Sequence, residues 1–476
     1  MKQSQLITQI ITPNRNISFP IGTILAVQNI YEHLNFNEVF DKYKKKGRDI
    51  NSLIQGLLSY KLTENQSISK ASDWINKKDI LELFKLLNFE ERTLFRVLEI
   101  IGINREEIIS DVQDRLFEKH KFEHTNINTD WTSFVLYGKK CPLGKYGHSK
   151  DHRPDKKQIT MGISELASPI NIPLGITIKA GNASDMKHFK DTYNISKRKL
   201  REGSLITFDK GASSRFNLDL VMTDHMKFLS SKKLNKSDDK RIKEFDRNKA
   251  ELVDEKRKVY GIKFEKPKKI DYFFFSEALK EEQLIFKKTK AKRKLEEAKI
   301  LQKCIERGKP LPAKYKIKNE LIEIKYAYQT KLSKLSEEEA SHLIESAVIN
   351  GREGFFCLIS NKNLTLKEAL ETYRKKDSLE KIFNSLKNEI EIKPLRVWTE
   401  NSIYGALIIG FLAQLFISLI RYENKNLKQI STKFIKRSLM NLTVTIEFDK
   451  SGKKRQVYAN FDDINQQILA KNMGIP

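Results

Sequence analysis

Two aspartates stand where a carboxylate is costly unless it binds something. Asp130 interrupts the strand-like run INTDWTSFVLYG, and Asp209 ends the apolar run LITFD directly before Lys210 and Gly211. A charge on or at the end of a buried strand loses hydration, so such positions are candidates for chemistry. A turn residue or a helix cap would also account for either aspartate taken alone.

A third carboxylate lies in the segment TYRKKDSLEKIFNSLKNEIEIKP. On a helical wheel, Glu380 falls at the edge of an apolar stripe, and Lys387, seven residues later, points in nearly the same direction. A carboxylate and an ammonium would then share the rim between core and solvent. An ordinary amphipathic helix shows the same pattern, whose stripe is formed by Leu379, Ile382, Phe383, Leu386 and Ile390.

The stretch YGHSKDHRPDKKQI, residues 146–159, is the most polar short segment between two apolar runs. His148 and His152 are four apart, as in a zinc-binding helix, but Gly147 and Pro154 bracket the segment and no apolar residue repeats at helical spacing. A solvated hairpin and a basic arm that contacts an anionic ligand are the other interpretations. The composition favours the basic arm.

The charge balance points to nucleic acid as a partner. The chain has 476 residues with 88 Lys+Arg against 61 Asp+Glu, a net charge of +27, and the basic residues are spread along it. An AT-rich genome would raise the lysine content of its proteins, but this bias would not by itself give so large a surplus of positive charge. The three cysteines form no CxxC pair, so neither a disulfide framework nor a structural zinc site is implied, which fits a reducing cytoplasm.

Taken together, these residues resemble a known family. Tyr373, Lys376, Glu380 and Lys387 have the spacing of the Tyr-Arg-Glu-Lys signature of DDE transposases from bacterial and archaeal insertion sequences, with Lys in place of the signature's Arg. The tract 146–159 and the segment WTENSIYGALIIGFLAQL are similar to blocks of the same family. Because Arg binds phosphate with two parallel donors and Lys as a point charge, the substitution predicts altered contacts to DNA ends.

The resemblance implies a ribonuclease-H-like catalytic domain that carries out phosphoryl transfer on DNA. Asp130, Asp209 and Glu380 would be the catalytic residues and the ligands of two Mg²⁺ ions, which Mn²⁺ could replace, since three carboxylates suit hard cations. The expected partners are double-stranded DNA, as terminal repeats and target, and a second copy of the chain. Besides Tyr373 and the two lysines of the signature, the expected DNA-binding residues are His148, Lys150, His152, Arg153, Lys156 and Lys157.

The expected fold class is α/β, a mixed five-stranded sheet with helices. Three strands joined by hairpins, a helical crossover near 186–200 and two more strands account for the middle of the chain. The tract 146–159 would connect the first two strands. The expected domains are an all-α N-terminal domain (1–118), the two parts of the catalytic domain (119–232 and 348–425), a charged helical insertion (233–347), and a C-terminal helix and hairpin (426–476).

One segment, 403–420, is long and apolar enough to resemble a membrane span, but interrupting glycines and polar residues favour a helix buried in the core. No membrane partner is therefore expected.

The function predicted is a cytoplasmic, nucleoid-associated prokaryotic transposase that cleaves the ends of its own element and joins them to target DNA. The alternatives are a nuclease of the same fold and a non-catalytic DNA-binding derivative.

Overall fold

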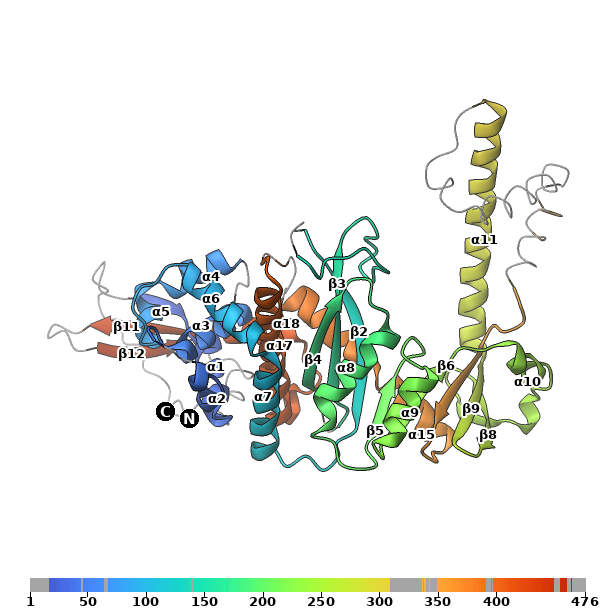
Figure 1. The fold of residues 1–476 in the computed structure, drawn as a ribbon, viewed down its shortest axis with the longest axis horizontal. Coiled ribbons are helices and arrows are strands. Elements are labelled where there is room, and N and C mark those ends of the chain that lie inside the picture. Colours follow the sequence, from blue (N-terminus) through green and yellow to red (C-terminus); the bar gives the residue numbers. More distant parts are fainter. Residues whose placement is uncertain are drawn as a thin grey trace. The chain divides into compact units, whose positions relative to one another are not determined.

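The computed structural model describes most of the chain as two compact units (Figure 1). The first unit combines Met1–Phe228 with Tyr373–Pro476, and the second is Leu229–Thr372. The described residues are 17–43, 46–63, 67–137, 141–168, 170–308, 349–390, 397–448 and 454–459, with 336, 338, 339, 342, 395 and 464.

Within the described part of residues 17–137, the first unit opens with a short strand and a run of helices. Polar caps start two of these helices, since Asp49 accepts from the Ser52 amide and Ser67 from the Lys70 amide. The expectation of a helical N-terminal region is confirmed. Its elements are β1 (Ile17–Pro20), α1 (Gly22–His33), α2 (Phe36–Phe40), a 3₁₀ turn (Asp41–Tyr43), α3 (Ile50–Leu62), α4 (Ile68–Ile75), α5 (Lys78–Leu83), α6 (Arg92–Ile103) and α7 (Arg105–Lys119).

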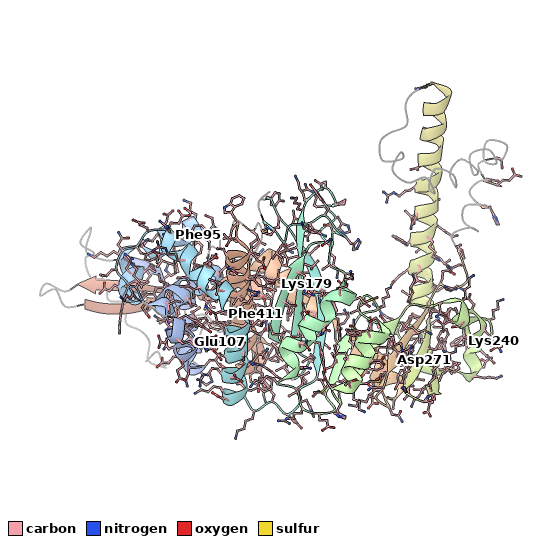
Figure 2. The ribbon with its side chains drawn as sticks, viewed as in Figure 1. Phe95, Glu107, Lys179, Lys240, Asp271 and Phe411 are labelled. Atoms are coloured by element: carbon pink, nitrogen blue, oxygen red, sulfur yellow. The ribbon has the colours of Figure 1, made fainter. Side chains whose placement is uncertain are left out.

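The helix α17 (Glu400–Glu423) forms the centre of the first unit's helical core. Along its middle it is buried on all sides; Phe411, for example, has no exposed surface (Figure 2). It is the one helix in the described part of the chain long and apolar enough to cross a membrane, yet 89% of its apolar window is buried in the protein. The prediction of a core helix is confirmed.

Two glycines let α17 and α6 approach each other closely. A Cβ added at Gly405 would lie 2.0 Å from the carbonyl oxygen of Leu98, and one added at Gly102 would lie 1.9 Å from that of Asn401. Since real Cβ atoms do not come so near a backbone oxygen, only glycine fits at either position.

A mixed sheet forms the other half of the first unit. The strands β2, β3 and β4 are joined antiparallel, and β5 returns parallel to β2 after the crossover helix α8. The strand order is β4-β3-β2-β5, and β6 follows after α9. The expected five-strand arrangement is confirmed, with β2 (Ile127–Val135), β3 (Gln158–Leu166), β4 (Ile172–Ala180), α8 (Asp185–Lys197), β5 (Leu205–Phe208), α9 (Arg215–Thr223) and β6 (Lys227–Lys232).

The chain's last described elements pair with its first strand. After α18 (Thr432–Asn441), the strands β11 (Thr443–Phe448) and β12 (Lys454–Ala459) form an antiparallel pair, and β1 adds to β11. The expected C-terminal helix and paired strands are present. The residues that connect the two strands of the expected hairpin, 449–453, lie outside the described residues.

The second unit corrects one prediction. The region 233–347 was expected to be helical, but it contains three antiparallel strands, β7 (Glu251–Asp254), β8 (Val259–Lys266) and β9 (Lys269–Ser276). The charged residues of β7 and β8 are partly or fully exposed, and such a charged composition resembles that of a solvated helix, whereas Tyr272–Ser276 of β9 are buried. The lysine-rich segment after them is helical as expected, in α11 (Glu277–Glu306).

The sheet of the second unit has the order β6-β10-β9-β8-β7. The strand β10 (Phe355–Ser360) pairs with β6, the last strand of the first expected catalytic segment, and with β9 of the insertion. Asp271 on β9 is fully buried (Figure 2). Burial alone would raise its pKa, but hydrogen bonds from Lys266 and Arg241 outweigh this and lower it.

Candidate active site

Strand pairing brings the two predicted aspartates together. Ile127 and Asn128 on β2 stand opposite Ile206 and Thr207 on the parallel strand β5. Asp130 and Asp209 are each three residues beyond the first of these pairs, so continuing the register places them at the same level. Neighbouring strands are about 4.8 Å apart, which brings the two carboxylates to one edge of the sheet.

The alternation of β2 turns Asp130 away from the crossover helix. Trp131 points to the opposite face, where its indole Nε1 donates to Thr192 Oγ1 of α8 at 3.0 Å and its ring packs against Phe189. Asp130 faces the side that carries the segment after Tyr373, and its side chain is 14% exposed. One face of β2 therefore packs against α8 through Trp131, and the other face carries the candidate catalytic residue Asp130.

Two residues of the predicted signature contact the two aspartates. The hydroxyl of Tyr373, near the end of α15 (Leu366–Arg374), donates to Asp209 Oδ1 at 2.8 Å. The Nζ of Lys376, which is 8% exposed, lies 3.4 Å from Asp130 Oδ2. Lys376, which replaces the Arg of the signature, thus places a buried ammonium group beside Asp130.

Lys387, the last residue of the signature, makes two side-chain hydrogen bonds. Its Nζ donates to Thr132 Oγ1 at 2.8 Å and to Asp151 Oδ1 at 2.9 Å. Lys387 lies in a π-helical turn (Ser385–Glu389) that continues α16 (Asp377–Asn384). Irregular turns of this kind often occur at functional sites, because they re-aim side chains that a regular helix would direct elsewhere.

Glu380 lies in the first turn of α16, and its side chain is exposed. The apolar stripe predicted beside it is buried in full: Leu379, Ile382, Phe383, Leu386 and Ile390. In the described part of the chain, Asp130, Asp209 and Glu380 do not form a group with ligand atoms within 4.8 Å of one another. The structure joins the two aspartates through the sheet and places Glu380 on the helix that follows Lys376.

The polar tract lies between β2 and β3, as expected. His148 and His152 are exposed, and neither belongs to a close group of metal-ligating side chains among the residues that are described. His152 adopts a left-handed backbone conformation with φ 56°, so the two histidines are not on a helix. The zinc interpretation of this tract therefore finds no support in the geometry.

The basic residues of the tract differ in their surroundings. Lys150 donates to the carbonyl of Trp131, and its Nζ lies 3.6 Å from Asp185 Oδ2, so this lysine turns towards the carboxylates. Arg153 forms a two-pronged pair with Asp155, whose pKa falls to about 2 chiefly because of that hydrogen bond. The side chains of Lys156 and Lys157 are both partly exposed.

The structure adds a carboxylate that sequence reasoning missed. Burial raises the pKa of Asp185, and the nearby charges of Asp130 and Asp209 raise it further, while Lys150 acts in the opposite direction. Asp185 begins α8 directly after Ser184, which by sequence is the pattern of a helix start and gave no sign of a site.

Glu165 is the second residue that sequence reasoning missed. It lies inside β3 with no exposed surface, and it accepts hydrogen bonds from Asn128 at 3.0 Å and from Ser378 of α16. Burial raises its pKa to about 7 in spite of these bonds. Glu165 ties α16 to the sheet and so holds the helix of Glu380 near the strand of Asp130.

By ligand type, Asp130, Asp185 and Asp209 suit a divalent cation that prefers oxygen, although in the described part of the chain they do not form a group with ligand atoms within 4.8 Å of one another. Asp130, Asp185 and Asp209 interact electrostatically, and a cation between them would relieve the repulsion that raises the pKa of Asp185. No cysteine or histidine is among these groups, and oxygen-only sites are typical of Mg²⁺, Ca²⁺ and Mn²⁺. Lys150 and Lys376 offset part of the negative charge of these carboxylates.

The site combines a mixed sheet, two aspartates at one level of the parallel strands β2 and β5, and a following helix that carries Glu380. The chain belongs to the family described as the transposase DDE domain, whose model matches residues 123–416. It is therefore a transposase, an enzyme that binds and cleaves DNA, and domains of this family use divalent metal ions.

Among solved structures, the chain is similar to a piggyBac transposase, determined by cryo-EM as a synaptic complex with hairpin DNA. The sequences are 12% identical, the TM-score is 0.42, and the match covers 90% of this chain and 80% of the other. No curated protein matches the sequence.

Proposed function

We propose that this protein is the transposase of an insertion sequence, which cleaves the ends of its element in the presence of Mg²⁺ and transfers the 3′-hydroxyls to target DNA. The observation that carries the proposal is the register of β2 and β5, which sets Asp130 and Asp209 side by side. The contacts of Tyr373 and Lys376 to these two aspartates support it, because they link the sheet to the helix of Glu380.

Each residue of the site has a distinct task in this proposal. Asp130, Asp209 and Glu380 would hold two Mg²⁺ ions, which would neutralise charge on the attacking and leaving oxygens of the phosphodiester. Tyr373 orients the carboxylate of Asp209, and Lys376 balances the charge of Asp130 until the site is loaded. Lys387, held by Thr132 and Asp151, is fixed where it can bind the phosphate beside the scissile bond.

Strand joining separates a transposase from a nuclease of the same fold. Purified protein incubated with Mg²⁺, a DNA fragment carrying the element's two ends and a supercoiled target plasmid should give covalently joined products. Sequencing of the junctions should show the 3′ ends of the element attached to target DNA. Cleaved ends without any joined product would instead establish the nuclease.

The polar tract 146–159 should contribute to DNA affinity through phosphate contacts. We expect the double variant Lys156→Ala/Lys157→Ala to bind DNA more weakly. The slope of log K against log[salt] should become shallower by about 2, since each lost phosphate contact removes roughly 0.9. The measurement is fluorescence anisotropy with an end fragment over a range of salt concentrations.

Lys190→Ala provides the matched control, because this exposed lysine lies on α8, outside the tract. For Lys190→Ala, the slope of log K against log[salt] should change by no more than about 0.9, the value for one phosphate contact. A wild-type slope in the double variant would remove Lys156 and Lys157 from the DNA interface.

The wider assignments follow from the same proposal. Pairing of two element ends requires two active sites, so the working form would be a homodimer on DNA. The basic segment of α11, with Lys290, Lys292 and Arg293 exposed, gives the second unit a surface suited to phosphate. The site of action would be the cytoplasm of a prokaryotic cell, on the nucleoid.

A further inference from the structure

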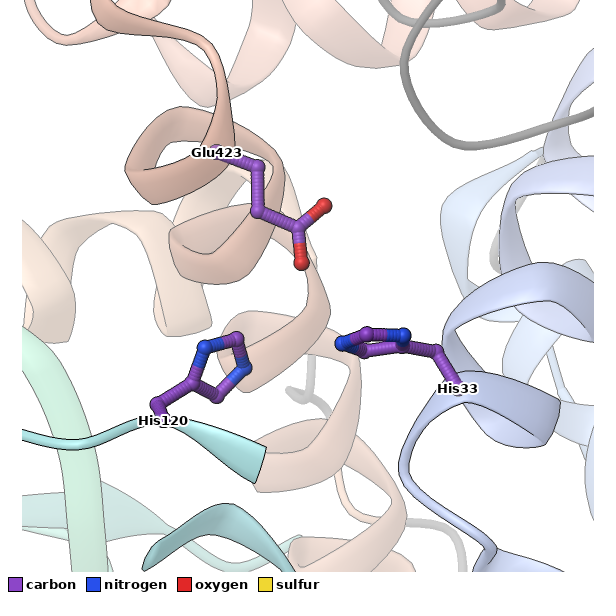
Figure 3. Close-up of side chains that lie close together, drawn as sticks. All are labelled: His33, His120 and Glu423. Carbon is purple, nitrogen blue, oxygen red and sulfur yellow. The ribbon is translucent and has the colours of Figure 1, made fainter. Parts of the chain in front are cut away.

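Three side chains remote in sequence converge at one point of the helical part of the first unit. Figure 3 shows His33, His120 and Glu423, with a ring nitrogen of each histidine and the carboxylate directed towards one another. One ligand atom from each residue lies within 4.8 Å of the other two, and no other such group occurs among the residues described. None of the three takes part in the active site.

His120 shows that this position lacks a partner in the protein alone. The residue is 9% exposed, and its Nε2 is buried without a hydrogen-bond partner in the structure. A buried polar atom of this kind is destabilising unless something binds it. Tyr422 and Phe122 pack around the ring at centroid distances of 5.3 and 5.8 Å, so the imidazole is held in place by aromatic contacts.

The positions of the three residues in their helices also favour a cation. His33 is the last residue of α1, His120 is the C-cap of α7, and Glu423 is the last residue of α17. The C-terminal end of a helix carries a partial negative charge, and three such ends meet here together with a carboxylate.

We propose that His33, His120 and Glu423 form a zinc site that joins the ends of α1, α7 and α17. Two imidazoles and a carboxylate are a ligand set of zinc sites that keep the fourth position for water. This set is softer than the oxygen-only carboxylates of the active site and so selects a different metal. Tetrahedral coordination brings ligand atoms to about 3.4 Å from one another. The ligand atoms here lie within 4.8 Å of one another, and rotation of the exposed His33 side chain can shorten these distances.

The zinc would act on stability and not on phosphoryl transfer. It would cross-link residues that are far apart in the sequence, and it would bind the folded chain and not the unfolded chain, which raises the free energy of unfolding. The region it joins includes the central helix α17 and the N-terminal helices. The inference does not depend on the function proposed above.

The test measures metal directly, in the full-length protein. A chelator first removes metal from the wild-type protein, which is then incubated with ZnCl₂ and excess Mg²⁺, the latter to fill oxygen-only sites. A desalting column removes unbound metal, and mass spectrometry measures the zinc bound per chain. We expect one zinc per chain and a higher Tm than that of the stripped protein. Co²⁺ in place of Zn²⁺ should give the visible absorption of a four-coordinate ion.

Variants locate the metal. His33→Ala and Glu423→Gln should bind zinc at least about tenfold more weakly, and zinc should no longer raise their Tm. His124→Ala is the control, since His124 is an exposed histidine near His120 in sequence, and it should keep one zinc. Less than a tenth of a zinc in the wild type, or equal zinc in wild type and His33→Ala, would overturn the proposal.

Discussion

Asp130→Asn should reduce strand cleavage by roughly 10³-fold while DNA binding stays close to that of the wild type. The substitution keeps the size of the side chain but removes the charge that would hold a metal ion. Metal stabilisation of the transition state is worth several kcal/mol, and each 1.36 kcal/mol corresponds to a tenfold change in rate. Cleavage of a labelled end fragment under single-turnover conditions measures the rate, and anisotropy measures the binding.

Glu380→Gln should behave in the same way, and this variant tests the carboxylate that α16 and not the sheet carries. Asp219→Asn is the matched control, because Asp219 is an exposed carboxylate of α9 outside the site, paired with Arg215. It should cleave at the wild-type rate. Undiminished cleavage by Glu380→Gln would exclude Glu380 as a metal ligand and direct attention to Asp185, the carboxylate that lies with the two aspartates.

The second large effect concerns stability. Gly405→Ala should lower the free energy of unfolding of the first unit by at least about 2 kcal/mol, although alanine favours helix by roughly 1 kcal/mol. The added Cβ would meet the carbonyl oxygen of Leu98 at 2.0 Å, and a backbone atom cannot move aside as a side-chain tip can. Urea unfolding followed by circular dichroism measures the loss as a lower transition midpoint.

Gly56→Ala is the control for the same substitution in a helix. Gly56 lies inside α3, and its added Cβ would meet the flexible side-chain end of Ile75 at 3.0 Å, which can rotate away. We expect stability within about 1 kcal/mol of the wild type. An equal, small effect in both variants would show that α6 and α17 do not cross as closely as the structure has them.

Much of the architecture was predictable because it depends on local periodicity. The helical stripe beside Glu380, the apolar core helix α17 and the strand-like runs that carry Asp130 and Asp209 all repeat at spacings that a sequence displays directly. The resemblance to DDE transposases depended on the same local blocks. The strands β7–β9 were missed because the high charge of the surrounding region outweighed the short apolar run of β9 in the interpretation.

The sequence by itself determined which side chains are available for chemistry and which elements carry them. Only the tertiary structure decided which of these side chains meet: the pairing of Asp130 with Asp209 across β2 and β5, the addition of Asp185 at the start of α8, and the convergence of His33, His120 and Glu423. These contacts join residues separated by tens to hundreds of positions. Their geometry follows from strand register and helix packing, which depend on non-local contacts and leave no periodic signal in the chain.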